Sequence, residues 1–182
     1  HPFMVAGRAT QLDHMTRGRT MFGVGPGALP SDASMMGIDA RDSRRMMEES
    51  LDVIVPLLEG ETVSAKTDWF TLDKARLQHA SYTQPRMEMA VTAVRSPAGA
   101  LIAGRLGLGI LSLGGHSDAA LEAYAKNWEI CEETAAAHGR TADRRNFRIA
   151  VQMHISETRD QALKDIDFGV EQWGGYARDV LP

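Results

Sequence analysis

Short apolar segments alternate with amphipathic helical segments along this chain, and this alternation constrains the fold more than any other feature. Each strand-like segment is followed by a segment whose apolar residues recur every three or four positions. This order is typical of parallel βαβ units, which cross over right-handed and bury their sheet. The strand-like segments cover residues 20–24, 89–94, 110–113 and 147–155, and the helical segments cover residues 3–15, 39–60, 96–106, 117–138 and 157–173.

Two regions depart from the alternation. Residues 61–85 have β composition around a polar turn at 65–68, which predicts an inserted hairpin. The stretch from 25 to 38 is rich in Gly, Pro and Ser and is expected to be irregular. We expect Asp39 to cap the following helix, and Pro56 to kink its last turn or confine the regular helix to the residues before it.

The composition is that of a soluble globular protein of one domain over residues 1–182. A net charge of -4 leaves no positive excess for nucleic acid. The apolar runs fall far short of the roughly 20 residues of a membrane span, and we expect no signal peptide. The single Cys131 lies in a helical pattern, so we expect a reduced, cytoplasmic thiol that packs as a small apolar residue.

A candidate site follows the strand at 89–94, because ligands of parallel α/β folds bind at the carboxyl ends of strands. Ser96 is expected to cap the next helix with Pro97 at its first position. The amides of Ala98 and Gly99, with Arg95 beside them, favour an anion such as phosphate at the helix N-terminus. A well-capped helix, in which Ser96 satisfies its own N–H groups, explains the same residues without a ligand.

Other chemistries find little support in the sequence. The six histidines form no metal-ligand spacing, so no metal is expected. No GxGxxG fingerprint and no nucleophile motif is present. His116, at the carboxyl end of a strand, is the one histidine placed near a potential site, and a capping or surface role explains it equally. The catalytic residues are therefore unknown.

The order of these segments resembles the bacterial-luciferase-like family of flavin-dependent monooxygenases. The resemblance rests on His1-Pro2, the basic turn at 17–19, the glycines at 23–27, the Trp69-Phe70 hairpin, and the segments 93–99 and 103–107. Within the family, residues 25–33, 67–72 and 96–99 are similar to limonene 1,2-monooxygenase-like members.

The resemblance implies an α/β fold that is part of a TIM (β/α)8 barrel, about strands 4 to 7, with the hairpin inserted. It also implies reduced FMN from a partner flavin reductase, activation of O2 on the flavin, and a small apolar, terpene-like substrate. The FMN phosphate would lie at Ser96, Pro97, Ala98 and Gly99, with Gly25 nearby. Luciferase places an arginine where this chain has Pro26, so Arg95 is the substitute cation that we expect. We also expect a homo-oligomer.

Because four strands cannot close a barrel, we expect the chain to be a fragment, inactive alone, with sheet edges prone to association. Two alternatives stay open. One is an F420-dependent oxidoreductase on the same barrel, and the other is a noncatalytic flavin-binding protein.

Overall fold

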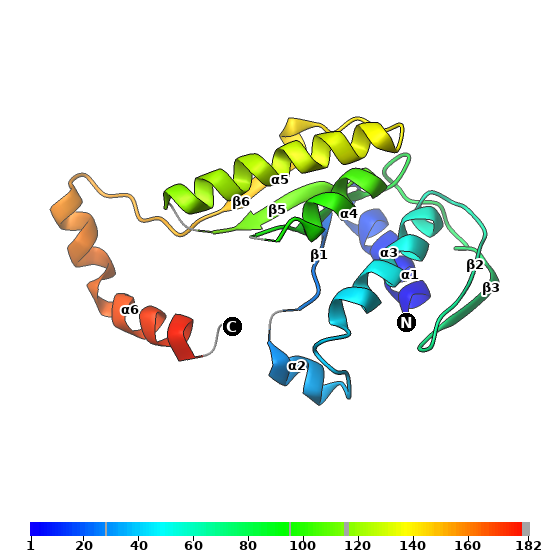
Figure 1. Cartoon of the computed structure of the whole chain (residues 1–182), viewed down its shortest axis with the longest axis horizontal. Helices are drawn as coiled ribbons and strands as arrows, with labels where there is room; N and C mark the ends of the chain where they lie inside the picture. Colours follow the sequence, from blue (N-terminus) through cyan, green and yellow to red (C-terminus); the bar gives the residue numbers. More distant parts are fainter. Residues whose placement is uncertain (28, 95, 115–116, 180–182) are drawn as a thin grey trace. The chain divides into compact units, whose positions relative to one another are not determined.

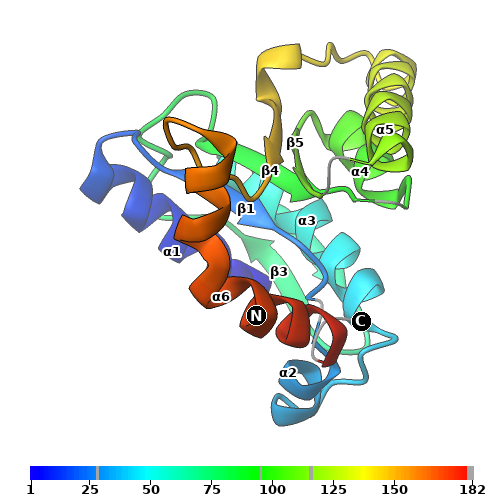
Figure 2. The same cartoon turned by 90° about the vertical axis from the view of Figure 1, so that its left-hand side faces the viewer.

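Two compact units make up the structure, a computed structural model that describes residues 1–27, 29–94, 96–114 and 117–179 (Figures 1 and 2). The first unit comprises His1–Gly25 and Arg44–Ala150, and the second holds the remaining described residues. The single domain expected over residues 1–182 stays a prediction.

A four-stranded parallel sheet forms the centre of the first unit, in the order β1-β4-β5-β6. The parallel sheet confirms the predicted α/β class. The strand expected over residues 147–155 stops early, because β5 ends at Leu113 and the partner of Leu113 is Ala150. Among the described residues, no strand pairs with the chain beyond Ala150. The strands are β1 (Met21–Val24), β4 (Glu88–Thr92), β5 (Gly109–Leu113) and β6 (Phe147–Ala150).

Four helices of the first unit share one core with one face of this sheet. Met89 and Val91 of β4 face that core, whereas Glu88 and Thr92 alternate to the opposite face. Helices α4 and α5 lie side by side in both views (Figures 1 and 2). The helices are α1 (Pro2–Thr16), α3 (Ser43–Leu58), α4 (Ala98–Leu106) and α5 (Asp118–Ala137), and the short 3-10 helix η1 (Arg144–Asn146) precedes β6.

The close packing of α4 and α5 depends on Gly104. A Cβ at this position would lie 2.6 Å from the carbonyl oxygen of Cys131 on α5. Cys131 itself is 2% exposed within the core. The prediction that its thiol packs as a small apolar residue is therefore confirmed.

The predicted hairpin is present as an antiparallel pair, β2 (Val63–Lys66) and β3 (Thr71–Ala75). Its strands end at Ala75, so residues 76–85 of the expected insertion leave the hairpin and form no regular strand. Thr83 in that segment donates its backbone N–H to the buried Asp13 carboxylate of α1 at 2.8 Å, and its hydroxyl donates to the same carboxylate at 2.9 Å. The exit from the hairpin is thereby tied to α1.

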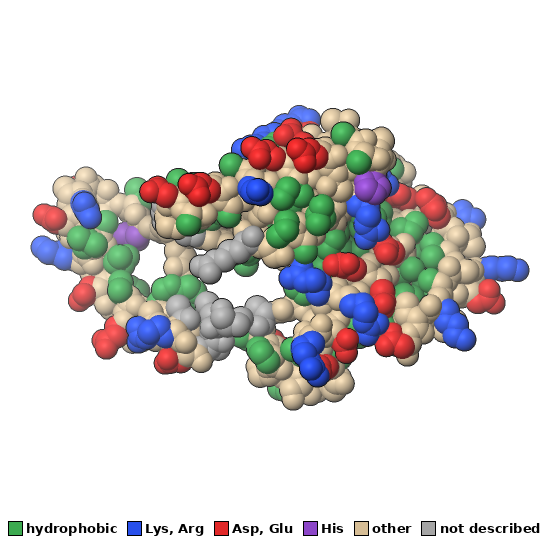
Figure 3. All heavy atoms as spheres, viewed as in Figure 1, with side chains coloured by type: hydrophobic (Ala, Val, Ile, Leu, Met, Phe, Trp, Pro, Cys, Tyr) green, Lys and Arg blue, Asp and Glu red, His purple; other side chains and the backbone are tan. Residues whose placement is uncertain are grey.

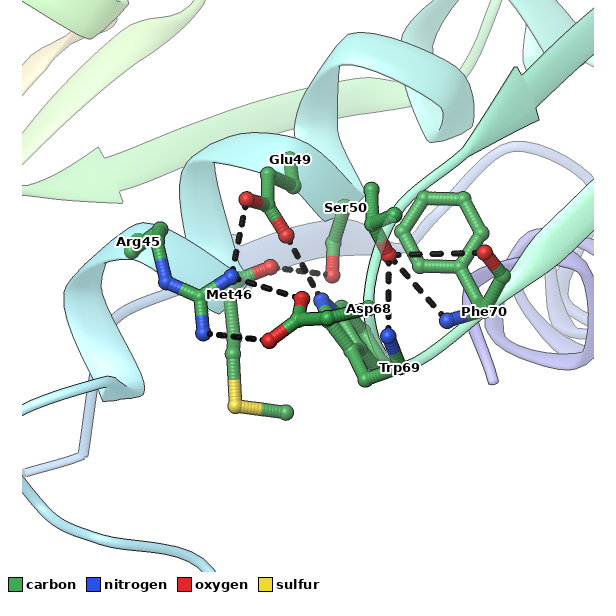
Figure 4. Close-up of polar contacts among 8 residues, drawn as sticks. Arg45, Met46, Glu49, Ser50, Asp68, Trp69 and Phe70 are labelled. Carbon is green, nitrogen blue, oxygen red and sulfur yellow. Dashed lines mark hydrogen bonds and ion pairs between the residues drawn. The ribbon is translucent and has the colours of Figure 1, made fainter.

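The turn of the hairpin is fixed to the first turns of α3 (Figure 4). Arg45 lies between Glu49 and Asp68, at 3.0 Å and 2.9 Å from their carboxylate oxygens. The indole N–H of Trp69 donates to the other oxygen of Glu49 at 2.7 Å. One carboxylate of α3 thus accepts hydrogen bonds from its own helix and from the hairpin.

Two local predictions are wrong, and so is one of the two outcomes expected at Pro56. The stretch from 25 to 38 was expected to be irregular, yet it contains the short helix α2 (Pro30–Met35), with Pro30 in the first turn, where proline is favoured. Asp39 was expected to cap the next helix, but its carboxylate accepts from the backbone N–H of Arg41 within the turn at residues 40–42. Helix α3 begins only at Ser43. Pro56 does not confine the regular helix to the residues before it, since α3 continues to Leu58 and buries its last residues in the core.

The second unit ends in helix α6 (Arg159–Asp179), which confirms the helix predicted over 157–173 and extends beyond it. In this unit the Asp165 carboxylate accepts from the side chains of Gln161, Ser156 and His154. Those hydrogen bonds, that of Gln161 first, hold the pKa of Asp165 below its usual range. No helix in the described part of the chain is both long and apolar enough to cross a membrane.

Candidate functional site at the carboxyl edge of the sheet

The carboxyl ends of the parallel strands lie along one edge of the sheet, and this edge brings Gly25 beside Thr92. Gly25 directly follows β1, and Thr92 is the last residue of β4. A Cβ at Gly25 would lie 2.8 Å from Oγ1 of Thr92, so the glycine lets the end of β1 approach this side chain. Thr92 was missed by the sequence analysis. Its signal was a single hydroxyl within the apolar segment 89–94.

Ser96 and Pro97 lie at the start of α4, one position earlier than predicted. The helix begins at Ala98, so Pro97 precedes it and Ser96 is not the N-cap. The exposed Ser96 hydroxyl still accepts from the N–H of Ala98 at 3.3 Å, and the N–H of Leu101 donates to the Pro97 carbonyl at 2.9 Å. The β-region backbone expected of a cap is absent at Pro97, whose φ of -70° and ψ of -10° are already helical.

Gly99 is buried against the end of β4. A Cβ here would lie 2.1 Å from the carbonyl oxygen of Thr92 and 2.9 Å from Cβ of Ala93. The glycine is therefore required where α4 packs on its own preceding strand. Its N–H, like that of Ala100, has no acceptor among the residues that the structure describes. Arg95, the predicted cation, lies outside the described residues, as does His116.

Two further polar residues of this edge were missed by the sequence analysis. The Ser112 hydroxyl, fully buried on β5, donates to the Ala93 carbonyl at 2.6 Å. The amide of Asn127 on α5, 2% exposed, donates to the Val94 carbonyl at 3.2 Å. A sequence signal existed for Asn127, which shares the buried face of α5 with Tyr124, Trp128 and Cys131.

Two cavities of about 320 Å³ each open near this edge of the sheet, and the second of them is lined in part by Pro97. The first lies at the strand ends, between Val94, Gly114 and the first turns of α5. The second is lined by Pro97, which precedes α4, and by residues of α5 that include Glu122 and Lys126. A larger cavity of about 480 Å³ is lined by α1 and residues 77–79 and by no residue of the β4–α4 connection. The edge of the sheet thus offers space, the exposed Ser96 hydroxyl, backbone amides at the start of α4, and the side chain of Lys126.

The outer face of α5 is strongly acidic. Acidic side chains line this helix in Figure 3. Of these acidic side chains, Glu122 lines the cavity beside Pro97, together with Lys126. The exposed acidic residues of α5 are Asp118, Glu122, Glu129, Glu132 and Glu133.

No metal centre is found within the described ranges, where no three His, Cys, Asp or Glu side chains lie close enough to hold an ion. His14 instead contacts the carbonyl oxygen of Ala80 at 2.9 Å, and His138 contacts that of Thr134 at 2.9 Å. His154 pairs with Asp165. These three histidines have structural partners.

This chain spans about half the length of two curated relatives that match nearly all of it. Limonene 1,2-monooxygenase of Rhodococcus erythropolis is 48% identical over 182 residues, which are 100% of this chain and 46% of that protein. The 4-hydroxyprotoasukamycin monooxygenase of Streptomyces nodosus subsp. asukaensis is 44% identical, over 98% of this chain and 48% of its own length.

Solved structures show the same fold. Monooxygenase RslO1 from Streptomyces bottropensis has a TM-score of 0.86 at 20% identity, over all of this chain and 54% of that one. The oxygenating constituent of 3,6-diketocamphane monooxygenase of Pseudomonas putida, in complex with FMN, has a TM-score of 0.75 at 22% identity, over 98% and 56% of the chains. An F420-dependent secondary alcohol dehydrogenase has a TM-score of 0.72 at 22% identity, over 97% and 52%.

Four adjacent parallel strands with their helices on one face correspond to part of a (β/α)8 barrel, as predicted. The family described as luciferase-like monooxygenase matches residues 1–180. This chain belongs to the luciferase-like monooxygenase family.

Proposed function

We propose that this chain forms the phosphate-binding part of a flavin-dependent monooxygenase. The observation that carries the proposal is the start of α4, where an exposed Ser96 hydroxyl and the first-turn amides lie at the carboxyl edge of a parallel sheet. A helix N-terminus carries partial positive charge and free N–H donors, which suit a phosphate. The donors present therefore fit the phosphate of FMN.

Each residue of the edge would have a limited task. Ser96 would turn its hydroxyl from the N–H of Ala98 to a phosphate oxygen, which frees that N–H to donate as well. Lys126, which lines the cavity beside Pro97, would supply positive charge across that cavity. Gly25 would let the end of β1 pack closely against Thr92, which leaves space for the ligand at the carboxyl ends of the strands. We assign Arg95 a supporting charge on the same turn.

The oxygen chemistry would belong to reduced FMN, delivered by a partner flavin reductase, while the protein binds, orients and excludes water. The substrate that we propose is a small apolar, terpene-like molecule, in line with the name of the 48% identical relative. We place this activity in the full-length gene product, which we propose to be a homo-oligomer in the cytoplasm.

FMN is the cofactor that we propose in place of F420. F420 carries carboxylates beyond its phosphate, and the cavity beside Pro97 includes the acidic Glu122 as well as Lys126. The F420-dependent neighbour resembles this chain at 22% identity, whereas both relatives above 40% identity are named monooxygenases. The two cofactors are therefore compared directly in the test.

The test measures dissociation constants of FMN, riboflavin and F420 for the full-length gene product by fluorescence titration. Riboflavin lacks the phosphate, so we expect tighter binding of FMN. Ser96→Ala should raise the dissociation constant of FMN about tenfold, which corresponds to about 1.4 kcal/mol of binding free energy. The dissociation constant of riboflavin should not change. Ser64→Ala is the control, because Ser64 also accepts a backbone N–H, from Lys74, but on the hairpin. Equal affinity for FMN and riboflavin, or a preference for F420, would contradict the proposal.

A further inference from the structure

Two buried side chains hold consecutive carbonyl groups of the segment that joins β4 to α4. Ser112 donates to Ala93 at 2.6 Å, and Asn127 donates to Val94 at 3.2 Å. Ser112 is 0% exposed and Asn127 is 2% exposed, so water cannot replace either donor without rearrangement. The carbonyl groups of Ala93 and Val94 are therefore held from two other elements, β5 and α5.

A second contact fixes the chain after Pro97, in the first turn of α4. Gly99 packs directly on Thr92, which fixes the first turn of α4 against the end of its own strand. The turn with Ser96 and Pro97 lies between these two anchors. Its donors can hold a constant direction although Ser96 and Pro97 are themselves exposed.

Helix α5 reaches the sheet edge through a second residue on the same face. Tyr124 lies one turn before Asn127 and is 5% exposed. A Cβ at Gly114, just beyond β5, would lie 1.7 Å from the Tyr124 hydroxyl, so the ring packs directly on this backbone. One face of α5 thus contacts the chain where it leaves β4 and where it leaves β5.

We propose that Ser112 and Asn127 are positioning residues for the phosphate-binding turn. This inference rests on the proposed function of Ser96 and the α4 amides. Neither residue touches the ligand. Each acts by holding a carbonyl of the preceding segment, so that the Ser96 hydroxyl and the N–H groups of the first turn point to one place before the cofactor arrives.

The experiment compares FMN with riboflavin in the full-length gene product, because only FMN reports on the phosphate turn. Ser112→Ala and Asn127→Leu each remove one donor with little change in volume. Both variants should bind FMN about tenfold more weakly and riboflavin as the wild type does. Retained riboflavin binding also reports that the rest of the site is folded.

Ser81→Ala is the matched control. Ser81 is 4% exposed and donates its hydroxyl to the Leu58 carbonyl at 2.9 Å, so it makes the same kind of buried bond far from the phosphate turn. This variant should be destabilised about as much as the other two. Its ratio of the dissociation constants of FMN and riboflavin should equal that of the wild type. Comparable ratios in all three variants would overturn the positioning role while Ser96→Ala still tests the phosphate site. A wild type that does not distinguish FMN from riboflavin would overturn both proposals.

Discussion

Gly99 lies so close to Thr92 that a side chain at position 99 would overlap the backbone of β4. Its Cβ would stand 2.1 Å from the Thr92 carbonyl oxygen, and a backbone oxygen cannot rotate away as a side chain can. The glycine at the start of α4 is thus explained by helix-to-strand packing. This contact sets the height of the proposed phosphate turn above the strand.

Replacing Gly99 by alanine should destabilise the protein by about 3 kcal/mol, at the upper end of the usual cost of overpacking. Urea unfolding followed by circular dichroism measures the change. Gly7→Ala in α1 is the matched control, since the nearest atom to its Cβ would be a Leu77 side-chain carbon at 4.0 Å. That variant should gain about 0.5 to 1 kcal/mol from helix propensity. Equal stability of the two variants would refute the contact.

The hairpin clamp of Figure 4 predicts unequal roles for its two donors. Trp69→Phe keeps a ring beside Phe70 but removes the N–H that donates to Glu49, which should cost about 1 kcal/mol. Arg45→Met removes exposed ion pairs with Glu49 and Asp68 and should cost only about 0.5 kcal/mol or less. Urea unfolding in low and high salt separates them, because only the arginine contribution should fall with salt. A salt-sensitive Trp69→Phe effect that is smaller than that of Arg45→Met would contradict this assignment.

The alternation of strands and helices made the parallel sheet predictable. Local signals made the helix ends predictable. Gly107 adopts the left-handed conformation after α4, with φ of 64°, and Ser117 accepts from the N–H of Ala120 at the start of α5. These signals lie within a few residues of their effect. Patterns of this range can be read directly from a sequence.

The arrangement at the sheet edge could not be read in that way. Asn127 and Val94 are 33 positions apart, and their contact depends on how α5 packs against β4. In the sequence, Asn127 can be placed on the apolar face of its helix, but the carbonyl that it contacts cannot be identified. The close approach of Gly25 to Thr92 likewise depends on strand order, because β4 pairs with β1 although two helices and the hairpin separate them in the sequence. Long-range packing decides such contacts, and a local pattern does not contain it.

Cys131 should be unreactive in the native protein. Burial, with a smaller contribution from Glu132, raises the pKa of its thiol from 9.0 to about 11. Thiol-reactive reagents at pH 8 should label Cys131 only after unfolding, because they react with the thiolate. Labelling with and without urea therefore measures the protection of this thiol. Because the folded pKa is the higher one, the stabilisation linked to this proton is complete below about pH 9 and is lost as the pH rises through about 11. Fast stoichiometric labelling of the native protein at pH 8 would disprove the buried position.

The pair Gly25 and Thr92 should show coupled effects on stability. Gly25→Ala places a methyl group 2.8 Å from the Thr92 hydroxyl and 3.3 Å from its methyl carbon, which should cost about 2 kcal/mol. Thr92→Ala removes those atoms, so the same Gly25→Ala change in that background should cost about 1 kcal/mol less. A double-mutant cycle by urea unfolding measures the coupling. Additive effects would mean that the end of β1 does not rest on Thr92, and the room that we assign above the strand ends would then need another cause.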